Sequence, residues 1–215
     1  MASAWCRTRG AARRRECFRR LFGLSVRRYL HLDCLIGELD SVEIRETIPS
    51  DRDAVREVHK GAFDPSESDT VSQLAIELLD DESSRPILSL VAEKDQQIVG
   101  SIIFTSIKVE DANPMAGSIL APLAVSKSCQ GTGIGTALIN RGVQILQERG
   151  VKFVMVYGDP AYYGRSDFHR NHNLEPPYQL EYPDAWMARD IEDGALTQIQ
   201  GKVVCAAPLM APEHW

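Results

Sequence analysis

The sequence lacks any long apolar stretch. Of its 215 residues, 44% are hydrophobic, but no run approaches the roughly 18 consecutive apolar residues that a membrane-spanning helix needs. The apolar residues are spread over a length that suits one globular domain with a core of its own. We therefore expect a cytoplasmic protein with no membrane partner.

Cysteines are few and show no metal-binding pattern. Their number is odd and no two have the C-x-x-C spacing; they are Cys6, Cys17, Cys34, Cys129 and Cys205. A disulfide framework uses an even set, and structural zinc sites use closely spaced pairs. The sequence therefore predicts neither disulfides nor a metal, as in a reducing compartment.

Acidic residues are nearly absent from the first 30 positions. Nine arginines and one acid, Glu16, give this stretch a net charge of +8, whereas the 15 basic and 29 acidic residues that follow give −14. This asymmetry predicts a basic extension attached to an acidic domain. The strand-like pattern that starts at Val42 places the extension, which we expect to be disordered, over residues 1–41.

Several interpretations of the extension stay open. It resembles a mitochondrial transit peptide in being arginine-rich and acid-poor, although it contains only Ser3 and Ser25 where such peptides are rich in serine. It could instead bind nucleic acid or a membrane surface, or be translated from upstream of the true start. We expect no nucleic-acid partner, and a mitochondrial location only if the extension is a transit peptide.

Hydrophobic periodicity predicts a mixed α/β domain. Alternating or continuous apolar runs predict strands over 42–46, 87–92, 98–109, 118–125, 151–157, 185–191 and 199–205. Helical spacing predicts helices over 53–63, 70–79 and 136–149 and a short helix over 161–169. This order indicates helices covering a mostly antiparallel sheet that contains one parallel step.

A glycine-rich turn joins the predicted strand 118–125 to the helix 136–149. Gly131, Gly133 and Gly135 lack a Cβ, so the backbone can take unusual dihedral angles and approach a ligand closely. The unpaired N–H groups and dipole of the following helix favour an anion at the same place. The turn therefore predicts a phosphate-binding loop.

Two other phosphate motifs do not fit this turn. A Walker loop needs a lysine, which Gly135 replaces here, and a dinucleotide fingerprint needs a third glycine, which Thr136 replaces. The fingerprint's acidic residue is also absent about 20 positions on. A turn that needs only positive φ stays open as the simpler alternative.

The motif and its surroundings resemble the GNAT superfamily of N-acetyltransferases. Gln130, Gly133 and Gly135 match its Gln-x-x-Gly-x-Gly signature, and Leu123 and Val125 match the preceding strand. A second motif over 158–168 and a closing stretch over 194–204 are most similar to the bacterial YhbS-like group of predicted acetyltransferases. The resemblance extends over about 43–208, which implies an acyltransferase domain over 42–208 and a tail over 209–215.

The second motif departs from the group at two positions. Relatives usually have an apolar residue and a glycine before the final phenylalanine, whereas this chain has Ser166 and Asp167 before Phe168. The departure bears on how the local helix ends and on catalysis.

The resemblance implies a GNAT-like fold and an acyl-CoA-dependent N-acyltransferase. Acetyl-CoA would be the co-substrate, and a small-molecule or protein amine would attack its thioester directly in a ternary complex. The strand would polarise the thioester carbonyl and bind the pantetheine arm, and the loop would bind the pyrophosphate. The implied cofactor-binding residues are Leu123, Ala124, Val125, Gln130, Gly131, Thr132, Gly133, Ile134, Gly135 and Thr136.

The aromatic residues have two interpretations each. Tyr163 aligns with the tyrosine that protonates the leaving thiolate, but Tyr162 and Tyr163 could also be packing aromatics. Trp186, Tyr178 and Tyr182 either line an acceptor pocket or fill the core.

A general base is not evident from the sequence. Glu77, Glu110 and Glu181 are candidates by position alone, whereas we interpret His59 as a packing residue and Cys129 as incidental. Two other functions stay open: a catalytically inactive CoA-binding sensor or interaction domain, and a nucleotide-dependent enzyme. A homodimer also stays open.

Overall fold

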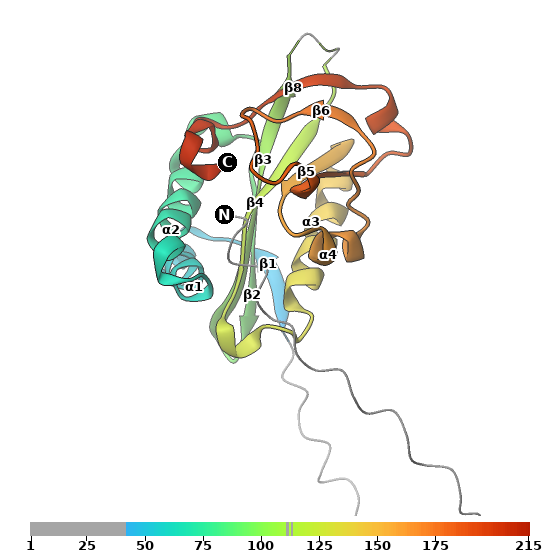
Figure 1. Ribbon diagram of the computed structural model, residues 1–215. Helices are drawn as coiled ribbons and strands as arrows, with labels where there is room; N and C mark the ends of the chain where they lie inside the picture. The colour runs from blue at the N-terminus through green and yellow to red at the C-terminus, as the bar shows by residue number, and fades with distance from the viewer. Residues whose placement is uncertain (1–41, 111, 113) are drawn as a thin grey trace, which may run out of the picture.

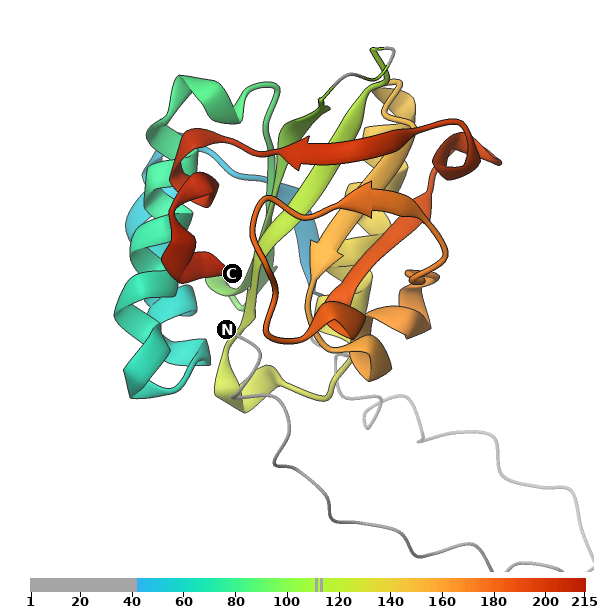
Figure 2. The ribbon, with the colours of Figure 1, turned by 45° about the horizontal axis from the view of Figure 1, so that its top comes forward.

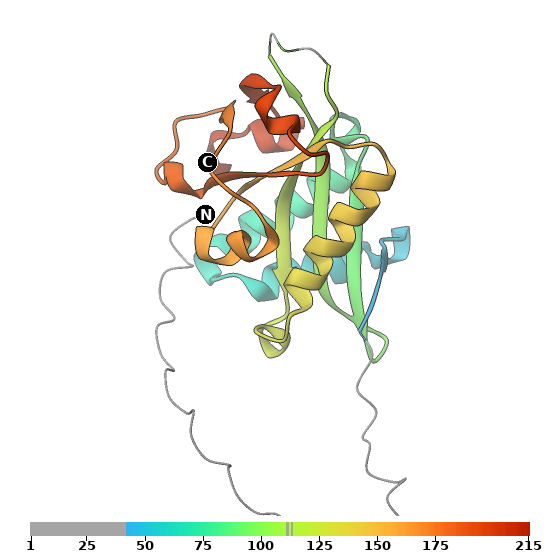
Figure 3. The ribbon, with the colours of Figure 1, turned by 90° about the vertical axis from the view of Figure 1, so that its right-hand side faces the viewer.

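The computed structural model describes residues 42–110, 112 and 114–215, which form a three-layer α/β structure (Figure 1). Two helices, α1 (Arg52–Ala62) and α2 (Pro65–Asp80), cover one face of a central sheet. The other face is covered by α3 (Ile134–Glu148), which crosses the strands obliquely (Figure 3). Within this described part of the chain, no helix is long and apolar enough to cross a membrane. The expected extension, 1–41, lies outside the described residues.

The sheet is mixed and mostly antiparallel, which confirms the predicted fold class. Its main path runs β1-β2-β3-β4-β5-β7 and contains one parallel pair, β4–β5, while β8 pairs with both β3 and β6. The strands are β1 (Glu43–Glu46), β2 (Leu88–Lys94), β3 (Gln97–Val109), β4 (Gly117–Val125), β5 (Phe153–Tyr157), β6 (Asn173–Glu175), β7 (Trp186–Asp190) and β8 (Gln200–Val204).

One local prediction was wrong, and one strand was missed. The helix predicted over 161–169 is shorter: α4 (Pro160–Tyr163) is followed by one 3-10 turn (Gly164–Ser166), and Asp167 then leaves the helical region. The strand β6 was not predicted, because three residues are too few to show an alternating pattern. β6 pairs in parallel with β8, which lies more than 20 residues later in the chain, so no local pattern predicts the pairing.

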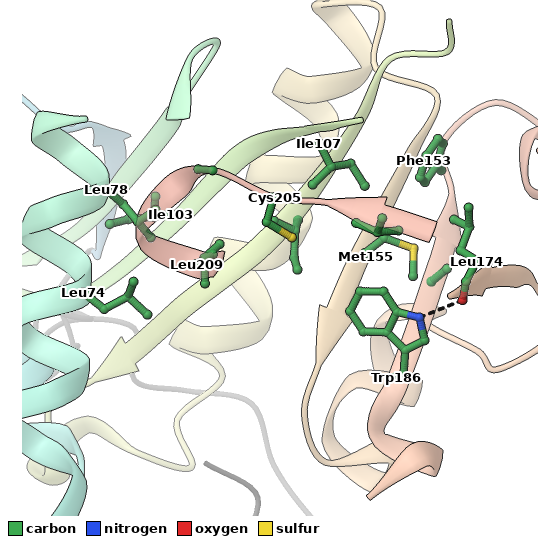
Figure 4. Close-up of a cluster of buried hydrophobic side chains, with 14 of the residues drawn as sticks. Leu74, Leu78, Ile103, Ile107, Phe153, Met155, Leu174, Trp186, Cys205 and Leu209 are labelled. Carbon is green, nitrogen blue, oxygen red and sulfur yellow. Dashed lines mark hydrogen bonds between the residues drawn. The ribbon is translucent and has the colours of Figure 1, made fainter. Parts of the chain in front are cut away.

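Each face of the sheet has its own hydrophobic core, because side chains alternate between faces along a strand. The first, which we call the α2-side cluster, includes Leu74, Leu78, Ile103, Ile107, Met155, Trp186 and Leu209 (Figure 4). The second, the α3-side cluster, includes Ile102, Phe104, Leu120, Leu138, Ile139, Val156 and Phe168.

Residues beyond 208 pack against the same domain. Leu209 is only 3% exposed and belongs to the α2-side cluster (Figure 4). Trp215 Nε1 donates a hydrogen bond to the Leu209 carbonyl at 2.7 Å. This segment lies beside α2 in the fold (Figure 2).

Two helical glycines provide a test of the packing between α3 and the sheet. A Cβ added at Gly142 would lie 2.6 Å from Phe104 Cζ, whereas one added at Gly61 of α1 would meet nothing within 4 Å. We expect Gly142→Ala to destabilise the protein by about 1–3 kcal/mol through overpacking. The matched control Gly61→Ala should stabilise it by about 0.5–1 kcal/mol through helix propensity. Urea unfolding measures both, and stabilisation by both substitutions would contradict the described packing.

Candidate functional site

The carboxyl ends of the two parallel strands, β4 and β5, separate. Their pairing ends at Leu120 and Val156, yet β4 continues to Val125 while β5 stops at Tyr157. Beyond the last pair the strands diverge (Figure 2). The sheet therefore has an opening that is bordered by the end of β4.

An extra residue in β4 accompanies this separation. Ile102 pairs with Leu123 and Phe104 pairs with Leu120, so two steps along β3 face three along β4. Such a bulge bends a strand and increases its twist. It also reverses the side-chain alternation: Ala121 packs with the α2-side cluster and Leu123 with the α3-side cluster. Without the bulge, these two residues would face the same way.

Two N–H groups of β4 point into the opening. The Ser126 N–H donates to the Val99 carbonyl of β3 at 2.8 Å. Since N–H groups alternate in direction along a strand, the Ala124 N–H also faces β3. The N–H groups of Leu123 and Val125 therefore point the other way, where β5 has already ended.

The glycine-rich loop follows β4 and is held by its own side chains. Gln130 Nε2 donates to the Val125 carbonyl at 3.0 Å, and Thr132 Oγ1 donates to the Cys129 carbonyl at 2.6 Å. Cys129 itself is a free cysteine beside the loop. The Gln130 bond connects the loop to the strand whose N–H groups line the opening, and the Thr132 bond closes the loop on itself.

Glycine is required in this loop for its backbone conformation. Gly131 and Gly133 have φ angles of 78° and 93°, which side chains disfavour. A Cβ at either position would meet nothing within 4 Å, so the surrounding space is open. Gly133 is the N-cap of α3, which begins at Ile134, two residues earlier than predicted. The unpaired N–H groups of the first helical turn thus lie beside the loop.

Gly135 is required for a different reason, a close contact with α4. A Cβ there would overlap the Tyr162 hydroxyl and lie 3.6 Å from Val125 Cγ2. The Tyr162 hydroxyl also hydrogen-bonds the side chain of Thr136. Tyr162 therefore connects α4 to the N-terminal turn of α3.

Tyr163 packs among aromatic rings on the α3 side of the opening. Its ring makes edge contacts with Tyr162 at 5.0 Å and Phe168 at 5.8 Å between centroids. A Cβ at Gly158 would overlap the Tyr163 ring. Burial raises the pKa of the Tyr163 hydroxyl, and Tyr162 and Asp159 raise it further. Tyr163 packs against the α3-side cluster, as Leu123 does. Because its pKa is raised, Tyr163 stays protonated at neutral pH.

The departure at Ser166 and Asp167 keeps the turn that ends the local helix. Asp167 has a φ of 61°, in the left-handed region where glycine is favoured and Asp is tolerated. Arg189 Nη1 donates to the Ser166 carbonyl at 3.0 Å, and its Nη2 lies 3.9 Å from Asp167 Oδ2. The aspartate therefore takes the conformation that a glycine would take and gains a cationic neighbour.

The three carboxylates considered as general bases lie in different places. Glu77 is on the exposed side of α2 and accepts a hydrogen bond from Gln73. Glu110 follows the far end of β3, where it lines a cavity of about 770 Å³ beside β6 and β8. Glu181 alone lies near the opening, since its charge acts on Tyr157 at the end of β5.

The aromatic residues considered for an acceptor pocket also separate. Trp186 is 5% exposed and donates from Nε1 to the Leu174 carbonyl at 2.9 Å, so it is a core residue (Figure 4). The Tyr178 hydroxyl donates to the Met210 carbonyl at 2.6 Å. Tyr182 is 42% exposed.

Sequence reasoning missed an aromatic pair on the α2 side of the opening. Tyr157, the last residue of β5, stacks on Trp215 with centroids 6.1 Å apart, and its hydroxyl accepts a hydrogen bond from the Tyr182 N–H at 3.4 Å. The position of Tyr157 at the end of an apolar strand was visible in the sequence. Its pairing with Trp215 was not, because it joins residues far apart in the chain.

The residues that form this site are similar to those of a known protein family. The model of the acetyltransferase (GNAT) family matches residues 52–173, which contain the opening, the loop and α4. The chain belongs to this family. Among its relatives are two uncharacterized N-acetyltransferases of Escherichia coli K12. YjhQ is 37% identical over 75% of this chain and 91% of its own, and YhbS is 30% identical over 74% and 93%.

Two solved GNAT structures resemble this one over most of their length. Escherichia coli YhbS in complex with CoA has a TM-score of 0.69 and 28% identity, and covers 77% of this chain and 95% of its own. A GNAT acetyltransferase from Brucella melitensis in complex with acetyl-CoA has a TM-score of 0.62 and 26% identity, and covers 79% and 99%.

His59 of α1 is a fully buried histidine beneath the β4 bulge of this GNAT domain. Its Nδ1 lies 2.9 Å from the Val55 carbonyl, so this nitrogen carries the proton. Burial lowers the pKa of His59 to about 4, and the carbonyl groups of Val55 and Pro122 offset only part of that shift. His59 is therefore neutral at pH 7.

This burial predicts a loss of stability in acid. The pKa of His59 is about 6.5 in the unfolded chain and about 4 in the folded protein. Between these pH values His59 is protonated in the unfolded chain but neutral in the folded protein, so the free energy of unfolding decreases as the pH falls. From pH 7 to 5 the loss should be about 2 kcal/mol. The His59→Leu variant should lose about 2 kcal/mol less than the wild-type protein between pH 7 and pH 5. This difference does not depend on how stable the variant is at pH 7. Urea unfolding at both pH values measures the difference, and an unchanged loss in the variant would contradict the assignment.

Proposed function

We propose that this protein transfers the acetyl group of acetyl-CoA to an amine by direct attack in a ternary complex. The proposal rests on the opening between β4 and β5. Two N–H groups of β4 point into this opening, and the glycine-rich loop and the N-terminus of α3 lie beside it. The CoA and acetyl-CoA complexes of similar GNAT structures support it.

The cofactor lies on the α3 side in this proposal. The loop from Gln130 to Thr136 binds the pyrophosphate, because the first-turn N–H groups and the dipole of α3 favour an anion there. The pantetheine arm runs along β4, where Leu123 and Val125 offer their N–H groups. Ala124 is buried and its N–H faces β3, so it lines the strand without donating.

The reaction needs positioning and charge stabilisation. The amine nitrogen attacks the thioester carbon, and the N–H groups of β4 stabilise the negative oxygen that develops. Collapse of this intermediate breaks the carbon–sulfur bond. The nitrogen attacks as a neutral amine, so a cationic acceptor first releases one proton from this nitrogen to solvent. After the attack the nitrogen releases a second proton to solvent, and the leaving thiolate gains one, for which Tyr163 is the proposed donor; solvent then reprotonates Tyr163.

The amine approaches from the α2 side, opposite the cofactor. Ala121 and the Tyr157–Trp215 pair border the opening there, and Glu181 lies close to Tyr157. Aromatic faces beside a carboxylate attract cations. The domain adds a long-range field, since residues 42–215 hold 15 basic and 26 acidic groups. We therefore propose cationic amines as acceptors.

The function is tested by measuring thiol release from acetyl-CoA with paired amines. A diamine or amino-acid amide should be acetylated faster than an acidic amine of the same size, and the preference should weaken at high salt. Calorimetry gives acetyl-CoA affinity in the same preparation. Binding without turnover on any amine would favour a CoA-binding sensor, and absence of binding would contradict the proposal as a whole.

The role of Tyr163 is tested by removing its hydroxyl. If Tyr163 protonates the thiolate, Tyr163→Phe should lower kcat by about 10²-fold and leave the acetyl-CoA Kd unchanged. Tyr178→Phe is the matched control, because the Tyr178 hydroxyl bonds Met210 on the α2 side. Wild-type turnover in Tyr163→Phe would leave Tyr163 a packing residue.

A further inference from the structure

The proposed phosphate loop contains no charged side chain. From Gln130 to Thr136 it offers only backbone, amide, hydroxyl and apolar groups, while CoA carries three phosphate groups. The nearest lysine in sequence, Lys127, donates from Nζ to the Phe63 carbonyl at 3.4 Å at the end of α1. A helix N-terminus supplies only about half a positive charge. A side-chain cation that assists the loop with the phosphates would therefore come from another element.

Such a cation lies on the 3-10 turn that follows α4. Arg165 Cζ is 5.0 Å from the centroid of the Tyr162 ring, and Arg165 Nε donates to the Tyr162 carbonyl at 3.4 Å. The Tyr162 hydroxyl in turn packs over Gly135 and bonds Thr136. One tyrosine thus holds a guanidinium beside the N-terminus of α3.

Arg165 differs from most of the described arginines in its partners, although Arg56 of α1 and Arg141 of α3 also have no described carboxylate within ion-pair distance. Most described arginines face a carboxylate, in the pairs Arg45–Asp51, Arg52–Asp80, Arg85–Glu82, Arg149–Glu46, Arg170–Asp184 and Arg189–Asp167. Arg165 is exposed, and none of the described carboxylates lies within ion-pair distance of it. Its planar donors are therefore available to a phosphate, which a guanidinium can bind through two hydrogen bonds.

We propose that Arg165, held over the ring of Tyr162, binds a phosphate of the acyl-CoA and so selects CoA thioesters over thioesters of pantetheine alone. This inference rests on the proposed function, which places acetyl-CoA at the loop. The selection follows because acetyl-pantetheine presents the same thioester and arm but no phosphate to Arg165.

The test compares two acyl donors in the full-length protein. Arg165→Gln should weaken acetyl-CoA binding roughly 10- to 100-fold, as the loss of a charged hydrogen-bonding partner does. The salt dependence of the remaining affinity should be smaller. Turnover of S-acetyl-pantetheine should be unchanged, because that donor never contacts Arg165. Tyr162→Leu should weaken acetyl-CoA binding in the wild-type background but much less in Arg165→Gln, since both substitutions act on one contact.

Arg170→Gln is the matched control, because Arg170 is a nearby exposed arginine already paired with Asp184. It should bind acetyl-CoA as the wild-type protein does. Unchanged acetyl-CoA affinity in Arg165→Gln overturns the inference, as does an equal loss with both donors. If the wild-type protein itself does not bind acetyl-CoA, the proposed function fails, and the inference fails with it.

Discussion

The site depends on one extra residue in β4. The segment of β4 between Leu120 and Leu123 is one residue longer than the segment of β3 that it pairs with. This bulge bends β4 at the point where its pairing with β5 ends, at Leu120 and Val156. The same irregularity places Ala121 on the α2 side and Leu123 on the α3 side. The two faces of the resulting opening differ: the glycine-rich loop and a helix N-terminus lie on the α3 side, and the Tyr157–Trp215 pair with Glu181 nearby lies on the α2 side. A regular parallel pair would use the N–H groups of Leu123 and Val125 within the sheet.

The second constraint is the junction between α3 and α4. Gly135 allows the Tyr162 hydroxyl to reach the first turn of α3, and Arg165 rests on the same ring. The turn after α4 ends at Asp167 in a left-handed conformation, with Arg189 beside it. These contacts fix the residues that follow β5 against the loop that follows β4. The proposed phosphate and thioester ends of the site are therefore parts of one packed unit.

Much of this arrangement follows from the sequence, because its signals are local. Alternating apolar residues predicted most strands, and three glycines before an amphipathic helix predicted the loop. The bulge had one sequence signal that was missed: Pro122 lacks an N–H, and a proline within a central strand is found at bulges. The contacts of Tyr162 with Gly135 and of Tyr157 with Trp215 join residues from distant parts of the chain, and only the folded structure brings them together. The sequence showed that Asp167 replaces a residue that is usually glycine in relatives, but it did not show the effect of this change. The φ of 61° at Asp167 explains why the turn is preserved.

The most direct measurement of the account is amide hydrogen exchange, resolved by residue with NMR, with and without acetyl-CoA and in the absence of an amine. The account predicts slower exchange at Leu123 and Val125 and at the first turn of α3 when acetyl-CoA is added. It predicts little change at Ala124, whose N–H already faces β3. Acetyl-CoA binding that leaves the Leu123 and Val125 amides unprotected would contradict the claim that the opening in the sheet holds the thioester.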